Sequence, residues 1–91
     1  MRTLTIVRRP GFFAKPQDVT LIADEKKIGE LKAEQQSVSL PFAGKEHVFQ
    51  AQISGRDGRI YRSNGIFENT AKREITLYLT VSGSSLTLER K

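Results

Sequence analysis

The sequence predicts an all-β fold, an antiparallel β-sandwich of seven to nine short strands, from three observations. Apolar and β-branched residues alternate with polar residues in several short runs. Turn signals that contain glycine, proline, asparagine or aspartate separate these runs at short intervals. The chain has 91 residues, a length that suits one small core and not two. We therefore expect a single sandwich domain over residues 1–91.

The first strand is expected at residues 2–9. Leu4 and Ile6 alternate there with threonine and valine, which is the pattern of a strand with one buried face, and a Pro-Gly pair ends the run. Phe12 and Phe13 follow in a short loop. Because neighbouring side chains of an extended backbone point to opposite faces, we expect one of these two phenylalanines to be partly exposed.

The stretch 25–36 is ambiguous between a helix and a hairpin. It is rich in helix-forming residues, and Asp24 could serve as the N-cap. Only Ile28 and Leu31 are large and apolar, however, and Gly29 in a helix interior would cost roughly 1 kcal/mol. We prefer the hairpin, with the helix left open as the alternative. The expected hairpin consists of a strand at 18–24, a turn at Glu25-Lys26, a return strand at 27–33 and a bulge at Gly29.

A second hairpin is expected around the run Ala43-Gly44-Lys45-Glu46. As a four-residue loop, this run places apolar residues of the two strands opposite one another. Pro41 lies on the other face and lacks an N–H donor, which favours a position at a sheet edge or near a strand end. The expected opposite pairs are Phe42 with His47, Leu40 with Phe49, and Val38 with Ala51.

The C-terminal residues predict a third hairpin, with two registers left open. A four-residue turn at 82–85 shifts the register by two residues from that of a two-residue turn at Ser82-Gly83, and it keeps the same side chains on each face. With the two-residue turn, Leu79 lies opposite Leu86 and Leu77 lies opposite Leu88. Together the last two hairpins supply most of the expected core, namely Leu40, Phe42, Phe49, Leu77, Leu79, Leu86 and Leu88.

Two tight-turn signals, Asp57-Gly58 and Asn64-Gly65, bracket a short run at residues 59–63. Around the second turn, Arg62 is expected to lie opposite Phe67. Neither face of this ribbon is uniformly apolar, so its alternation specifies the register only weakly.

Four runs in the first half of the chain carry a resemblance to a known family: Val19-Thr20-Leu21-Ile22-Ala23-Asp24, Ile28-Gly29-Glu30-Leu31, Val38-Ser39-Leu40-Pro41 and Gly44-Lys45-Glu46-His47-Val48-Phe49. These runs resemble PEGA-type domains and related small bacterial β-sandwich families. The resemblance covers about residues 19–53, and it implies a seven-stranded sandwich that serves as an attachment or interaction module without catalytic residues. It also implies that Asp24 opens a turn, Gly29 marks a bulge, and Gly44 with His47 starts the returning strand. The sequence departs from the pattern because Glu25 replaces the turn glycine, two residues separate Gly44 from His47, and a later Gly-Tyr is missing.

Composition excludes several kinds of chemistry. The chain has no cysteine and one histidine, so it offers neither a thiolate metal cluster, nor a disulfide, nor a multi-histidine zinc site. It also lacks a Gly-x-Ser-x-Gly nucleophile turn and a glycine-rich phosphate loop. The one histidine, His47, is expected to be a packed structural residue. We therefore expect no enzyme activity, no cofactor, no metal and no small-molecule substrate.

The N-terminal apolar residues end within seven positions, and no segment approaches the roughly 20 apolar residues of a membrane span. We expect a soluble cytoplasmic protein. The leading functional expectation is a non-enzymatic module that binds a protein partner or a second copy of itself. Phe12 and Phe13 are the candidate contact residues, and the competing interpretation is that they form a plug that caps one end of the sandwich. Open sheet edges would offer a route to strand addition.

The alternative function is binding of single-stranded nucleic acid or another polyanion by a small β-barrel. The net charge of +5 permits an anionic partner, although the charge is spread evenly along the chain. A structural role for Arg62, as a cation-π cover for Phe67, competes with this reading. The candidate phosphate contacts are Arg56, Arg59, Arg62, Lys72 and Arg73, and Tyr61 or Phe67 would stack on bases.

Overall fold

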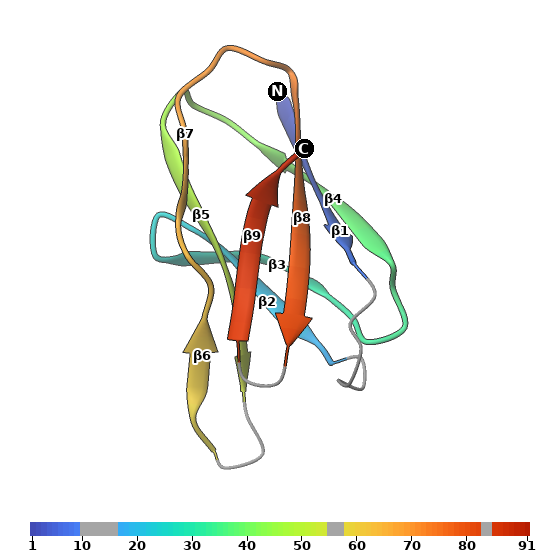
Figure 1. Ribbon diagram of the computed structural model, residues 1–91. Coiled ribbons are helices and arrows are strands. Elements are labelled where there is room, and N and C mark those ends of the chain that lie inside the picture. The colour runs from blue at the N-terminus through green and yellow to red at the C-terminus, as the bar shows by residue number, and fades with distance from the viewer. Residues whose placement is uncertain (10–16, 55–57, 83–84) are drawn as a thin grey trace.

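The computed structural model describes residues 1–9, 17–54, 58–82 and 85–91. Within these ranges the chain forms nine β-strands and no helix, and the strands build two packed sheets (Figure 1). The predicted all-β sandwich is therefore confirmed. Phe12, Phe13 and Arg56 lie outside the described residues.

The first sheet, here the β1 sheet, has the order β4-β1-β8-β9. Strand β1 pairs with β8 in parallel, while its pairing with β4 is antiparallel. The second sheet, here the β5 sheet, has the order β3-β2-β5-β6, with β7 also paired to β5. The strands are β1 (Arg2–Arg8), β2 (Val19–Ala23), β3 (Lys26–Leu31), β4 (Ser37–Phe42), β5 (His47–Ser54), β6 (Ile60–Arg62), β7 (Ile66–Glu68), β8 (Glu74–Ser82) and β9 (Ser85–Arg90).

The core lies between the two sheets and takes alternate residues of the strands, as the period of two requires. In β1, for example, Leu4 and Ile6 are buried while Thr3 and Thr5 face outward. Full burial of a leucine or isoleucine side chain contributes about 1.5–3 kcal/mol. Of the core expected from the last two hairpins, Leu40 is half-buried against the core cluster, and the buried residues are Phe42, Phe49, Leu77, Leu79, Leu86 and Leu88.

Within the stretch 25–36, residues 25–31 belong to a hairpin and none of the residues is helical, so the helix alternative is wrong. The turn lies at Asp24-Glu25, one residue earlier than predicted, and both residues adopt positive φ angles of 51° and 67°. Two consecutive positive φ angles characterise the two-residue turn whose twist matches paired strands. The register also shifts between Leu21 and Ile22 and skips Ile28, so the bulge lies beside Gly29 as predicted.

The predicted pairing of residues 38–42 with 47–51 is wrong. Strand β4 pairs with β1, and β5 pairs with β2, so the two strands lie in different sheets. Phe42 still contacts Phe49, with ring centroids 5.4 Å apart, but it does so across the core. Alternation shows which side chains face the core and does not show which strand is the neighbour. The expected edge position of Pro41 is confirmed, because β4 is an edge strand.

The predicted turn at Asn64-Gly65 with Arg62 opposite Phe67 is also wrong. Strands β6 and β7 both pair with β5, where Arg62 lies opposite Gln52 and Phe67 opposite Val48. The two short strands therefore follow one side of β5. In the C-terminal hairpin Leu79 pairs with Leu88, which is the register of the longer predicted turn.

Candidate functional site

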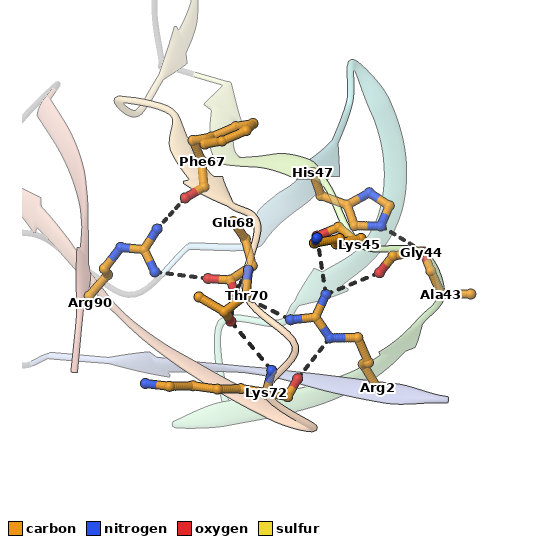
Figure 2. Close-up of polar contacts among 10 residues, drawn as sticks. All are labelled: Arg2, Ala43, Gly44, Lys45, His47, Phe67, Glu68, Thr70, Lys72 and Arg90. Atoms are coloured by element: carbon orange, nitrogen blue, oxygen red, sulfur yellow. Dashed lines mark hydrogen bonds and ion pairs between the residues drawn. The ribbon is translucent and has the colours of Figure 1, made fainter.

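A buried carboxylate lies at the end of β7. The Glu68 side chain has no exposed surface, and its oxygens accept hydrogen bonds from three residues (Figure 2). Oε1 accepts from Arg90 at 2.8 Å, while Oε2 accepts from Arg2 at 3.2 Å and from the Thr70 backbone N–H at 3.1 Å. The Thr70 hydroxyl also donates to Oε2. Both carboxylate oxygens are therefore occupied.

Burial by itself would raise the pKa of Glu68, because a charged carboxylate loses its hydration. The hydrogen bonds from Thr70 and Arg90, together with the charge of Arg90, outweigh that effect and lower the pKa to about 2. Glu68 is thus ionised at neutral pH and fully bonded. This arrangement suits a structural anchor and does not suit a group that exchanges protons with a substrate.

Arg2 connects this carboxylate to two loops. Its Nε donates to the Lys72 carbonyl at 2.7 Å, and its Nη1 donates to the Gly44 and Lys45 carbonyls at 3.0 and 3.4 Å (Figure 2). The guanidinium carbon also lies 4.7 Å from the centre of the Phe42 ring. One side chain therefore holds β1, the β4–β5 connection and the β7–β8 connection together at this end of the sandwich.

Arg90 fixes the backbone of β7 from the other sheet. Besides its bond to Glu68, it donates to the carbonyl oxygen of Phe67 (Figure 2). The Phe67 side chain points away from the core and is 52% exposed. Val48, its partner on β5, is 38% exposed. An aromatic residue is thus displayed to solvent on a backbone that a buried ion cluster holds in place.

The outer face of β5, β6 and β7, here called the Phe67 face, has apolar residues at both ends. Phe67 and Val48 lie at one end, and Ile60, which is 62% exposed, lies at the other. Arg62 lies between the two ends, and Gln50 and Gln52 are its polar neighbours on β5.

The Arg62 side chain is engaged on this face, but not by Phe67. Its Nε donates to Gln52 at 2.8 Å, and its Nη1 lies 2.7 Å from a carboxylate oxygen of Glu25. The two charged side chains are 43% and 70% exposed, so their pairing contributes only about 0–1 kcal/mol. Among the described residues, the cation-π contacts are those of Arg2 with Phe42 and of Arg9 with Tyr78. The cation-π contact predicted between Arg62 and Phe67 is therefore wrong.

The structure does not bring the predicted phosphate contacts together. Arg59 and Arg62 lie at β6, whereas Lys72 and Arg73 lie in the β7–β8 connection at the opposite end of the molecule (Figure 1). Tyr61 is paired with Ile53 and packs against the core, so it does not join Phe67 on the outer face.

Three sheet edges in the described part of the chain, those of β9, β4 and β3, are protected. The Asn64 side chain donates to the Leu88 carbonyl at 3.0 Å and accepts from the Leu88 N–H at 2.9 Å, so a side-chain amide occupies the edge of β9. Pro41 removes a donor from the edge of β4. The edge of β3 carries a bulge and the charged residues Lys27 and Glu30. Charges, proline and bulges are the usual defences against strand addition.

Sequence reasoning missed Arg2, Glu68, Arg90, Val48 and Ile60. One signal was available, since Arg2 has the same parity in its strand as Leu4 and Ile6 and therefore shares their inward face. Contact with Glu68 depends on the packing of three strands that are distant in sequence, and no local pattern reports it.

In the part of the chain that the structure describes, no group of three or more histidine, cysteine, aspartate or glutamate side chains is placed to hold a metal ion. The same residues contain no helix that is long and apolar enough to cross a membrane. Comparisons with protein-family models, with curated proteins and with solved structures found no match to this chain.

Proposed function

We propose that this domain is a protein-interaction module and that the Phe67 face is its contact surface. The observation that carries the proposal is the exposed pair Phe67 and Val48, with exposed Ile60 on the same face. Exposed aromatic and aliphatic side chains on neighbouring strands gain free energy when a partner removes them from water.

Rigidity supports this assignment. Arg90 bonds the Phe67 carbonyl and the Glu68 carboxylate, so the β7 backbone is ordered before any partner arrives. A contact residue that is already fixed loses little conformational entropy on binding, and aromatic residues are frequent among the side chains that dominate interfaces. The protected edges of β9, β4 and β3 favour contact through side chains over strand addition at those strands.

The position of Arg62 indicates what kind of partner suits this face. It lies between the two apolar ends, and its counter-ion Glu25 is 70% exposed. A partner carboxylate can therefore replace Glu25 at little cost, because the exposed pair is weak. We infer that the partner is a protein segment that combines apolar side chains with a carboxylate.

The proposal is tested by selecting displayed random peptides on the wild-type domain and on a Phe67→Ser variant. Peptides enriched on the wild type are expected to contain aromatic or aliphatic residues with Asp or Glu, and to lose binding to Phe67→Ser. Val7→Ser, on the outer face of the other sheet, is the matched control and should retain binding. Enrichment that is equal on Phe67→Ser and wild type would contradict the proposed surface.

Self-association is examined in the same set of proteins. Sedimentation velocity at protein concentrations from about 10 µM to about 1 mM detects dimers with dissociation constants of up to about 1 mM. A concentration-dependent dimer that disappears in Phe67→Ser would identify the partner as a second copy. A strict monomer, together with no Phe67-dependent peptide, would refute the interaction proposal.

A second candidate is polyanion binding at the end of the molecule that contains Arg2. Four basic residues near Arg2 form no ion pair with another described residue. Two of them, Lys72 and Lys91, line a cavity of about 330 Å³ beside Glu68. Binding to mixed single-stranded oligonucleotides at low and moderate salt tests this function, since phosphate contacts weaken as salt rises. No binding at low salt would exclude it. The four residues are Lys45, Lys72, Arg73 and Lys91.

A further inference from the structure

His47, the one histidine of the chain, bridges two loops. Its Nδ1 lies 2.6 Å from Oδ2 of Asp24 in the β2–β3 turn, and its Nε2 lies 2.6 Å from the carbonyl oxygen of Ala43 in the β4–β5 connection. Figure 2 shows the contact with Ala43. Both distances are short for hydrogen bonds that involve nitrogen. A single ring thus ties the turn to the connection.

Both partners of this ring are acceptors. A backbone carbonyl has no proton to donate. The Asp24 carboxylate accepts from the Val48 N–H at 2.9 Å through its other oxygen, and the bonds from Val48 and His47 lower the pKa of Asp24. Asp24 is therefore ionised at neutral pH. A neutral imidazole carries one N–H, so both contacts form together only when His47 is a doubly protonated imidazolium.

The ring is held on its other sides as well. It lies nearly parallel to Phe49, with centroids 5.8 Å apart and an interplanar angle of 27°, and meets the Phe42 ring edge-on at 5.4 Å. Gly44 adopts a φ of 96°, and a Cβ atom placed there would lie 3.1 Å from Nε2. The two phenylalanine rings therefore restrict rotation of the imidazole, and the missing side chain of Gly44 leaves space for Nε2 beside Ala43.

Asp24 is the one charged group that contacts the ring directly among the described residues. The others act at longer range or through the loops. Arg2 donates to two carbonyls of the β4–β5 connection and, with Arg90, neutralises Glu68 opposite His47 in the ladder. The charged neighbours are Asp24 and Glu25 of the β2–β3 turn, Lys26 of β3, Lys45 and Glu46 of the β4–β5 connection, Arg2 of β1, and Glu68 of β7.

We propose that His47 is a proton-dependent latch that fastens the β4–β5 connection to the β2–β3 turn and releases it when the ring loses a proton. Histidine is the side chain whose charge ordinarily changes between about pH 5 and 8. The neutral ring keeps its remaining proton on Nδ1, because a hydrogen bond to a carboxylate is stronger than one to a carbonyl. Nε2 then presents a lone pair to the Ala43 oxygen, and the two atoms repel each other.

Release of Ala43 affects its neighbours in the connection. The Gly44 and Lys45 carbonyls accept hydrogen bonds from Arg2. Displacement of the connection therefore also weakens these two hydrogen bonds. On the other side of the latch, Asp24 donates its N–H to the Val48 carbonyl at 3.0 Å. The contacts of His47 do not involve the Phe67 face, so the test of the latch is independent of whether that face binds a partner.

The experiment is a ring-nitrogen NMR titration of the protein labelled with ¹⁵N-histidine, which yields one set of signals because the chain has one histidine. In a titration from acid to alkaline pH, both ring nitrogens are expected to carry protons at the acid end, and the one proton that remains at the alkaline end is expected on Nδ1. Amide exchange at residues 44–47, corrected for its intrinsic pH dependence, is expected to be about fivefold to tenfold faster at the higher pH. A neutral ring with its proton on Nε2, or equal corrected exchange at both pH values, would overturn the proposal.

Two variants assign the effect. His47→Gln should abolish the pH dependence of exchange at residues 44–46, while Glu46→Gln, a charge change in the same connection, should leave it unchanged. Loss of the pH dependence in Glu46→Gln would contradict the assignment to His47. If His47→Gln fails to fold, the proton position measured on the wild-type ring decides the matter.

Discussion

Arg2 and Arg8 lie on the same face of β1, and each contacts the loops at one of the two opposite ends of the sandwich. Between them, Leu4 and Ile6 are buried in the core, so one strand contributes two apolar residues flanked by two guanidinium groups. Each guanidinium donates to loop carbonyls at its own end. Arg2 donates hydrogen bonds to the carbonyl oxygens of Gly44, Lys45 and Lys72. Arg8 donates to those of Gln17, Lys32 and Gln35.

The cluster around Glu68 predicts a large effect of Glu68→Gln. The amide keeps the shape of the side chain but removes the charge that balances Arg2 and Arg90, so the free energy of unfolding should fall by about 2–4 kcal/mol. Urea unfolding followed by circular dichroism measures the change. Glu89→Gln is the matched control, because the ion pair of Glu89 with Arg9 is exposed and its loss should cost less than about 1 kcal/mol. Equal losses in the two variants would show that burial of Glu68 has no energetic role.

Acid should destabilise the domain in a defined pH range. The pKa of Glu68 is lowered from 4.5 to about 2, so the stabilisation is present above the unfolded-state pKa and disappears as the pH falls through the folded-state value. The expected contribution, about 3 kcal/mol, should therefore be lost between about pH 5 and pH 2. Unfolding free energies measured across this range give the slope. Glu68→Gln should flatten it, and an unchanged slope in that variant would assign the acid sensitivity to other carboxylates.

Asn64 provides a test of edge protection. Asn64→Ala removes both hydrogen bonds to Leu88, and it should lower the free energy of unfolding by about 1–2 kcal/mol. It should also increase association at high concentration, because the edge of β9 then has unpaired groups. Asn69→Ala, at an exposed position outside the strands, is the control and should change neither property. Sedimentation velocity and urea unfolding measure the two effects, and normal behaviour of Asn64→Ala in both would refute the protective role.

The β2–β3 turn predicts a stabilising substitution. Glu25 has a φ of 67°, a conformation that costs a side-chain-bearing residue roughly 1–2 kcal/mol and glycine almost nothing. Glu25→Gly creates an Asp-Gly turn and should raise the free energy of unfolding by about 0.5–1 kcal/mol, even though the weak pair with Arg62 is lost. Glu25→Ala loses the same pair without relieving the strain and should be neutral or destabilising. Thermal and urea unfolding distinguish the two, and a less stable Glu25→Gly would contradict this account of the turn.

The sequence was sufficient to identify most strands and their buried faces, because a period of two assigns each side chain to one face without knowledge of its neighbours. It identified the inward residues of β1, the hairpin at 18–33 and the bulge beside Gly29. It could not show that β4 pairs with β1 and not with β5. Both arrangements bury the same apolar residues, and only the packing of the whole chain distinguishes them.

The candidate site shows the same division. Phe67 and Arg62 were named from the sequence, but as contacts for a nucleic acid and as neighbours in a ribbon that does not form. Their common face, the buried Glu68 behind it and the His47 bridge all depend on strands that are distant in sequence. Alternation by itself determined which apolar residues face the core. Tertiary structure decided which charges meet there, because charge pairing depends on distances between strands that no local pattern encodes.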